Sequence, residues 1–251
     1  MRQFLNRWMP PDYSAHGWQI DQIVILVHWL MFILLVFWGT LFLYSLIRFR
    51  ASRNPKASYQ GITSHWSRWG EAGLAAVEVI LLAGFSIPAW YRWAGRAEQT
   101  GGSRPFEVRI VAEQFAWNVH YPGPDGKFGR TDVRLVSATN PVGLDLSDPA
   151  AKDDVVAINQ LHLPVNRQVL IHISSKDVIH SFKLPVMRVE QDAIPGMDVP
   201  IHFTPVRTTN GDRWEIACAQ LCGLGHYRMR GLLSVDSQKD LDQWLKDQAA
   251  P

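Results

Sequence analysis

The chain has 251 residues, of which 47% are apolar and 19% are charged, and its formal net charge is +2. This length exceeds the usual size of one domain, but the apolar excess gathers near the N-terminus, which is atypical of two soluble domains. The basic residues form no clustered stripe of the kind that binds a phosphate backbone. We therefore exclude nucleic acid as a partner.

The segment 22–47 contains no Asp, Glu, Lys or Arg. A helix of this length, at about 1.5 Å rise per residue, crosses a hydrocarbon core of roughly 30 Å, so we predict a first transmembrane helix here. The preceding segment 1–21 lacks the short apolar core and small-residue cleavage site of a signal peptide. We expect it to remain as an external segment, with the first span acting as the insertion signal.

A second transmembrane helix is predicted at 71–93, where Glu71 and Glu78 interrupt an apolar segment bordered by aromatic residues. The connecting segment 48–70 is basic and has no acidic residue. The positive-inside tendency places this loop in the cytoplasm, so both termini face the outside.

After a linker at 94–105, short alternating apolar segments separated by Pro, Gly and Asp predict β-strands. Many short strands at this spacing favour a sandwich or Greek-key barrel. Residues 138–153 show no clear period and are interpreted as a long surface insertion, whereas Ser237 caps an amphipathic repeat that predicts a C-terminal helix within 237–251. The expected strands are 106–120, 133–137, 155–163, 168–174, 181–186, 201–205, 214–218 and 231–235.

The segment 218–229 contains Cys218, Cys222, His226 and Met229, including both cysteines of the chain. Thiolate, imidazole and thioether together favour copper over magnesium or calcium. A mononuclear copper site normally uses one thiolate, so a second cysteine four positions on suggests two thiolates that bridge two copper ions. A disulfide is the alternative, but closing so short a loop removes little unfolded-state entropy and leaves the histidine and methionine unexplained.

The pattern Cys-Ala-Gln-Leu-Cys-Gly-x-x-His-x-x-Met at 218–229, with the upstream segments 177–182 and 192–196, resembles the copper A motif of cytochrome c oxidase subunit II. The resemblance covers nearly the whole chain, because that family also begins with two membrane spans. It implies a two-helix transmembrane hairpin followed by an all-β cupredoxin-like Greek-key barrel at 106–236. It also implies two copper ions, with the cysteines bridging, the histidines terminal, and the methionine and a carbonyl as weak axial ligands. The implied ligands are His180, Cys218, the backbone carbonyl of Gln220, Cys222, His226 and Met229.

The same resemblance implies a function in a respiratory haem-copper oxidase of the bacterial inner membrane. The copper domain would lie on the periplasmic side, accept electrons from cytochrome c or a pre-docked cytochrome, and pass them to haem in subunit I. There, oxygen would be reduced to water with coupled proton translocation, alongside other oxidase subunits. The alternative is the copper A subunit of a nitric oxide reductase, because the motif does not name the terminal acceptor. A nitrous oxide reductase would need a propeller-sized partner domain, and a copper carrier would need an exchangeable site with fewer ligands.

Several positions depart from the family pattern or leave alternatives open. Gln220 replaces a common glutamate whose carboxylate holds magnesium or manganese beside subunit I, so we expect that site to be weak or absent. Phe115 aligns with the tryptophan through which electrons usually enter, and Trp117 with a later aromatic residue; ordinary barrel packing is the alternative for both. Glu71 matches a glutamate at the mouth of a proton pathway, with an interfacial acid at a helix N-terminus as the alternative. For Glu78 we expect an interhelical hydrogen bond to another subunit.

Overall fold

The computed structural model describes residues 7–56, 59–60, 64–94 and 104–249. Two compact units are present, one formed by residues 19–92 and the other by residues 1–18 together with 93–251. Most of the expected linker at 94–105 lies outside the described residues.

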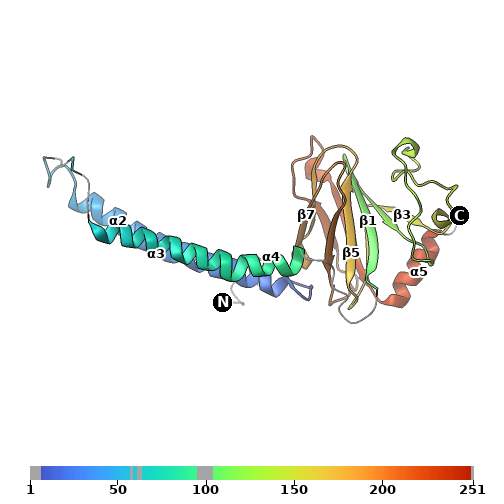
Figure 1. Cartoon of the computed structure of the whole chain (residues 1–251), viewed down its shortest axis with the longest axis horizontal. Helices are drawn as coiled ribbons and strands as arrows, with labels where there is room; N and C mark the ends of the chain where they lie inside the picture. Colours follow the sequence, from blue (N-terminus) through green and yellow to red (C-terminus); the bar gives the residue numbers. More distant parts are fainter. Residues whose placement is uncertain (1–6, 57–58, 61–63, 95–103, 250–251) are drawn as a thin grey trace. The chain divides into compact units, whose positions relative to one another are not determined.

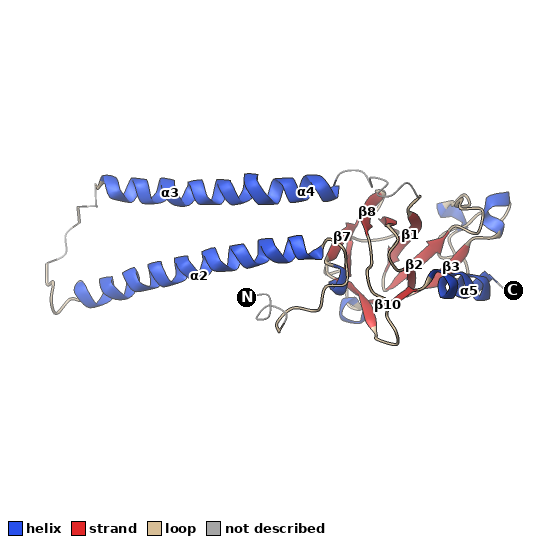
Figure 2. Cartoon of the chain, turned by 90° about the horizontal axis from the view of Figure 1, so that it is seen from below, coloured by secondary structure: helices blue, strands red, loops and turns tan. Residues whose placement is uncertain are grey.

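The unit 19–92 is helical (Figure 2). The Oγ of Ser64 accepts a hydrogen bond from the N–H of Trp66 at 3.2 Å and so caps the second long helix. Both helices begin before the apolar segments predicted as spans. The bounds are α2 Gly17–Arg48, α3 His65–Leu81, the π-helical turn η1 Leu82–Ser86 and α4 Ile87–Ala94.

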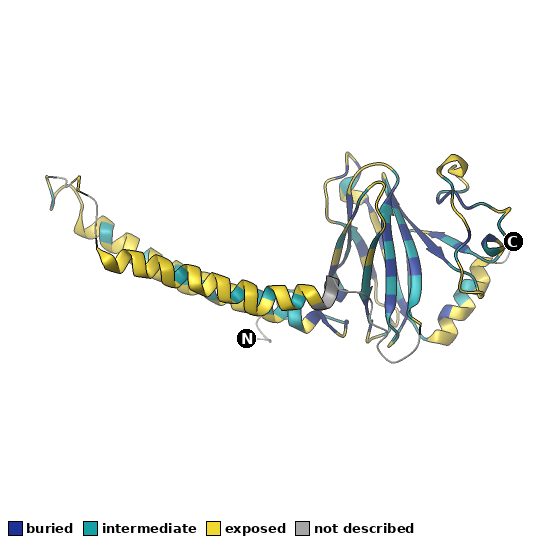
Figure 3. Cartoon of the chain, viewed as in Figure 1, coloured by how far each residue is buried: buried dark blue, intermediate teal, exposed yellow. Residues whose placement is uncertain are grey.

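Two helical segments, Gly17–Arg48 and His65–Tyr91, are long and apolar enough to cross a membrane, and 0% of each apolar window is buried. Figure 3 shows their surfaces as mostly exposed with intermediate patches, whereas the strands of the other unit alternate mainly between buried and intermediate residues. Apolar surface of this extent on a soluble protein would mark an interaction site or an aggregation risk. In a lipid bilayer, these apolar surfaces would instead face the hydrocarbon chains.

The larger unit contains two five-stranded sheets that face each other (Figure 1). Their strand orders are β3-β2-β1-β5-β8 and β4-β10-β9-β6-β7, with β1–β5 and β4–β10 as parallel pairs. The expected all-β cupredoxin-like fold is confirmed, followed by helix α5 (Gln238–Ala249). The strands are β1 Phe106–Glu113, β2 Ala116–Tyr121, β3 Val155–Ile158, β4 Gln160–Pro164, β5 Val169–Ser175, β6 His180–Leu184, β7 Val189–Ala193, β8 Val199–Phe203, β9 Trp214–Cys218 and β10 Arg230–Asp236.

Several strand predictions were wrong in detail. The segment 106–120 is a hairpin, because the chain reverses between β1 and β2 at Gln114 and Phe115. The segment 155–163 divides at Asn159, which has a φ of 58° and whose Oδ1 accepts the N–H of Trp117 at 2.8 Å. At this residue the chain passes from one sheet to the other. The edge strand β7 was missed because its central residues, Glu-Gln-Asp, are polar.

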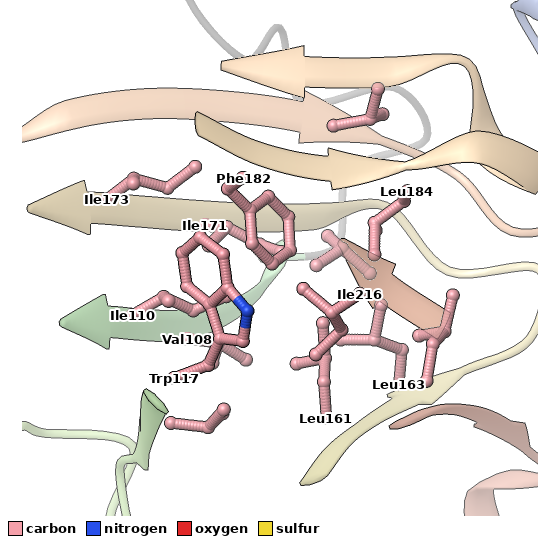
Figure 4. Close-up of a cluster of buried hydrophobic side chains, with 14 of the residues drawn as sticks. Val108, Ile110, Trp117, Leu161, Leu163, Ile171, Ile173, Phe182, Leu184 and Ile216 are labelled. Carbon is pink, nitrogen blue, oxygen red and sulfur yellow. The ribbon is translucent and has the colours of Figure 1, made fainter. Parts of the chain in front are cut away.

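The space between the sheets is filled by a continuous apolar core (Figure 4). Trp117 and Phe182 are fully buried and meet edge to face, with ring centroids 5.4 Å apart. Fully burying a large apolar side chain contributes roughly 1.5–3 kcal/mol, so this core gives a stable support for the loops at the ends of the strands.

Residues 10–16, which we call the N-terminal strap, pack against the β-sheet unit. The N–H of Tyr13 donates to the carbonyl of Val186 at 2.8 Å, and the N–H of Ala15 donates to that of Thr204 at 3.0 Å. The ring of Tyr13 stacks on Trp214 with centroids 4.8 Å apart. The segment before the first long helix is therefore a structural part of this unit.

The insertion at 138–153 lies next to β1 and β3 and has a small core of its own. Val142, Leu144 and Ala151 are buried against Val111 and Val156. Residues 133–137, expected as a strand, form instead a 3-10 helix at 133–135, whose N-terminal cap is an aspartate side chain. This short helix can form because the cap satisfies a free backbone donor.

A buried histidine–aspartate pair lies where the insertion ends. His120 Nε2 lies 2.6 Å from Asp154 Oδ2, and both side chains are almost fully buried. The same carboxylate oxygen accepts the N–H of Gly129 at 2.8 Å. Burial lowers the pKa of His120, and this effect exceeds the opposing influence of Asp154.

Candidate metal centre

Strand pairing brings the upstream histidine to the cysteine loop. Strands β6 and β9 are antiparallel, with Phe182 opposite Cys218, so the start of β6 lies beside the end of β9. His180 begins β6, and Cys218 ends β9. The loop then returns to β10 through Met229, whose carbonyl accepts the N–H of Cys218 at 3.4 Å. Two segments far apart in sequence thus meet at the ends of two neighbouring strands.

All six predicted ligand groups lie within one cluster. The Sγ atoms of Cys218 and Cys222 are 3.8 Å apart, and both cysteines are free. This separation rules out a disulfide in this structure, because a bonded sulfur pair is about 2.05 Å apart. The remaining distances are 3.9 Å from Cys218 Sγ to His180 Nδ1, 3.2 Å from Cys218 Sγ to the Gln220 carbonyl oxygen, 3.6 Å from Cys222 Sγ to His226 Nδ1, and 3.7 Å from Cys222 Sγ to Met229 Sδ.

The donor set fits a soft metal ion. The ligand atoms of His180, Cys218 and Cys222 all lie within 4.8 Å of one another. A thiolate bond to an ion such as Zn²⁺ is about 2.3 Å long. Two sulfurs 3.8 Å apart could therefore both bond to the same ion. Thiolate, imidazole and thioether are ligands that copper accepts. The side chains of His180, Cys222 and Met229 are buried, which keeps water away from the centre.

Without a metal ion, the surroundings of Cys222 favour its neutral thiol. Burial is the larger cause and the neighbouring Cys218 the smaller one of a rise in the pKa of the Cys222 thiol to about 11. The buried thiol is therefore held protonated until a positive charge arrives, because a coordinating metal ion deprotonates a thiol.

Asp177 orients His180 and was assigned no role in the sequence prediction. Its Oδ1 lies 2.8 Å from His180 Nε2, which leaves Nδ1 directed at the sulfurs. Such a carboxylate partner fixes the tautomer and ring orientation of a metal-ligating histidine. Burial opposes ionisation of Asp177, but hydrogen bonds from His180 and from the N–H groups of Gln114 and Val178 outweigh it and lower the pKa of the carboxyl group. The sequence signal for this role is a carboxylate three residues before the histidine.

The aromatic segment before β2 supports the same loop. Phe115 is half-buried, and its ring lies beside Gly223 and Gly225. Trp117 is fully buried, with its ring centroid 6.2 Å from that of His180. Both residues therefore pack in or on the barrel.

Glu71 and Glu78 lie on α3 in the helical unit. Because α3 begins at His65, Glu71 lies beyond the first turn and accepts a hydrogen bond from Ser67 Oγ at 3.4 Å. The attraction of a helix N-terminus for an acid falls off within the first turn. The alternative of a terminal interfacial acid is correspondingly weaker.

Known proteins align with nearly the whole of this chain. Residues 107–235 match the family model described as cytochrome c oxidase subunit II, periplasmic domain. The alternative cytochrome c oxidase subunit 2 of Bradyrhizobium diazoefficiens is 31% identical over 242 residues, covering 96% of this chain and 84% of that protein. The cytochrome c oxidase subunit 2 of Cereibacter sphaeroides is 25% identical over 259 residues, covering 94% and 81%.

Among solved structures, the periplasmic domain of subunit II of cytochrome oxidase from Bradyrhizobium japonicum is 25% identical, with a TM-score of 0.42, and covers 58% of this chain and 95% of that domain. The resemblance inferred from the copper motif is confirmed by the family match and by the relatives that align along nearly the whole chain. The chain belongs to the cytochrome c oxidase subunit II family.

Proposed function

We propose that this chain is the copper A subunit of a haem-copper terminal oxidase. It accepts electrons from a cytochrome c-type donor at a centre of two copper ions and passes them to haem in subunit I, where oxygen is reduced to water with coupled proton translocation. The ligands are His180, Cys218, the Gln220 carbonyl, Cys222, His226 and Met229.

One observation carries this proposal: two free thiols 3.8 Å apart, each with an imidazole Nδ1 within 3.9 Å of its sulfur. A mononuclear cupredoxin-type site would require one thiolate and two histidines. The second thiol, with its own histidine, provides for a second ion. Bound copper would supply one-electron redox chemistry.

The protein's own residues hold the ligands in place. Asp177 holds His180 with Nδ1 towards the sulfurs, and the antiparallel β6–β9 pairing fixes the distance between His180 and Cys218. The buried side chains of Cys222 and Met229 exclude water. A site built on strands of a packed core changes little when its charge changes, which favours fast electron transfer.

The N-terminal strap supports a topology with two spans. Its residues hydrogen-bond to strands and turns of the β-sheet unit, so both must lie on the same side of a membrane. The chain between them must then cross the bilayer an even number of times, which agrees with the two candidate spans. We propose that both lie on the periplasmic side of the bacterial inner membrane, with segment 48–70 in the cytoplasm.

The test is spectroscopic and uses the purified, copper-loaded full chain. We expect two copper ions per chain and, in the oxidised form, a seven-line copper hyperfine pattern from one unpaired electron shared by two nuclei. One copper ion with a four-line pattern would refute the dinuclear centre. In the purified complex, consumption of nitric oxide in place of oxygen would support the alternative reductase.

The side chain of Gln220 bears on whether the complex also binds magnesium or manganese. Its side chain is an exposed neutral amide, whereas hard divalent cations prefer charged oxygen ligands. We expect metal analysis of the purified complex to find no stoichiometric magnesium or manganese at this residue. Gln220→Glu restores a carboxylate and should increase manganese retention; stoichiometric manganese bound through the glutamine itself would contradict the expectation.

A further inference from the structure

Gln114 bridges the two halves of the metal centre through two separate donors. Its backbone N–H donates to Asp177 Oδ2 at 2.7 Å, and this carboxylate holds His180 through its other oxygen. Its side-chain Nε2 donates to the carbonyl of Cys222 at 2.6 Å. One residue in the β1–β2 turn therefore contacts both the support of a histidine ligand and the backbone of a cysteine ligand.

The side-chain amide lies tightly over the cysteine loop. Gly223 has a φ of 131°, and a Cβ built there would lie 2.7 Å from Gln114 Nε2. The glycine thus leaves room for the amide to reach the carbonyl of Cys222. Other backbone hydrogen bonds hold the loop on either side of Cys222: the N–H of Ala219 donates to the carbonyl of Ser181 at 2.9 Å, and the N–H of His226 donates to that of Gly223 at 3.1 Å. The bond from Gln114 reaches the carbonyl of Cys222 itself and links it to the Asp177–His180 pair.

We infer that Gln114 is a positioning residue, whose side-chain amide fixes the Cys222 peptide relative to the Asp177–His180 pair and so sets the geometry of the two ligand groups. This inference rests on the proposed function for its consequence in copper binding, but not for its effect on the loop. Gln114 is largely exposed, so its hydrogen bond competes with water and contributes little to global stability. Its effect is local.

The experiment uses the full chain in detergent, first without metal and then copper-loaded. Gln114→Met keeps the length of the side chain and the backbone N–H but removes the side-chain donor. The matched control is Gln243→Met, which removes a hydrogen bond from Nε2 to Asp247 Oδ1 at 2.8 Å on α5. Amide hydrogen exchange, thermal unfolding of the metal-free protein, and copper loss to a chelator are measured for each.

In the metal-free protein, Gln114→Met should raise the exchange rate of the His226 amide by roughly three- to tenfold, the factor expected for one hydrogen bond. The midpoint of thermal unfolding should stay unchanged. In the loaded protein, copper affinity should fall by about 10- to 100-fold, as for other residues that orient metal ligands, and the copper hyperfine splitting should change. Gln243→Met should match the wild type in all three.

Loop exchange and copper affinity equal to wild type in Gln114→Met would overturn the inference. A fall in the unfolding midpoint that accounts for the whole loss of copper would also overturn it, since the role would then be general stability. If the wild-type chain bound no copper pair, the proposed function would fail, yet the exchange measurement on the metal-free loop would still decide the role of Gln114.

Discussion

Gly225 lies against the ring of Phe115, so a methyl group at this position should displace the loop that carries Cys222 and His226. A Cβ built on Gly225 would lie 2.6 Å from Cγ of Phe115, which is closer than real atoms approach. The φ of Gly225 is −94°, a value that alanine adopts without strain. The cost of Gly225→Ala is therefore steric and not conformational.

Rotation of the Phe115 ring away from the added methyl group would cost free energy, because the ring packs on the core and also lies beside Gly223. Forcing an extra methyl group into a packed site costs typically about 1–3 kcal/mol, and we expect Gly225→Ala to lower the free energy of unfolding by that amount. Phe115→Ala removes Cγ and the whole ring and so makes room for the methyl group. The double variant should then recover about 1 kcal/mol or more relative to the sum of the single changes.

The assay is denaturant unfolding of the full chain, followed by a signal of the β-sheet unit, together with copper content after loading. Gly126→Ala is the control, because Gly126 has a φ of 68° with nothing within 4 Å of its Cβ, so its cost comes from the backbone alone. Phe115→Ala should not rescue it. Additive single-variant costs for Gly225→Ala and Phe115→Ala would refute the steric reasoning.

Three further predictions follow from the structure. Tyr13→Ala should lower the free energy of unfolding by about 1–3 kcal/mol through loss of the stacking on Trp214, whereas Tyr13→Phe should retain most of it; equal losses would contradict the stacking. Because burial depresses the pKa of His120 below 6.5, the unfolded chain binds a proton that the folded chain does not, so stability should fall as pH drops below that value. His120→Gln, which still reaches Asp154, should show a shallower loss between about pH 7.5 and about pH 5 in thermal unfolding, and an unchanged slope would count against the assignment. Glu71→Gln should slow turnover and proton uptake of the purified complex by at least about tenfold if this carboxylate conducts protons, and unchanged rates would remove it from the pathway.

The elements that the sequence predicts well are those whose signal is local. The uncharged segment 22–47 requires a long apolar helix whatever surrounds it, and α2 indeed contains it. Ser237 accepts the N–H of Asp240 at 3.2 Å, as its capping pattern predicts, and starts α5. The ligand types at 218–229 also reveal their chemistry without a fold, because few other functions use this combination.

The prediction was wrong where tertiary contacts override local pattern. The buried apolar positions change phase between β1 and β2, from 108, 110 and 112 to 117 and 119, but residues 113–116 between them contain no Gly or Pro to mark the turn. Strand β7 is polar in its centre because it is an edge strand, and its identity depends on pairing with β6. Residues 133–137 have strand-like composition, but Asp132 caps a short helix there instead.

The metal centre shows the same division between its ligands and their supports. Asp177 lies three residues before His180, and a ligating histidine often has a carboxylate partner, so its role can be predicted from the sequence. The bond from Gln114 to Cys222 joins residues 108 positions apart, and no sequence period connects them. Ligands must have particular chemistries, whereas the groups that position them need only a hydrogen atom or an oxygen in the right place, which many side chains can supply. For this reason, the proposed copper ligands can be named from the sequence. The residue proposed to position the cysteine loop can be identified only from the structure, in which the β1–β2 turn contacts that loop.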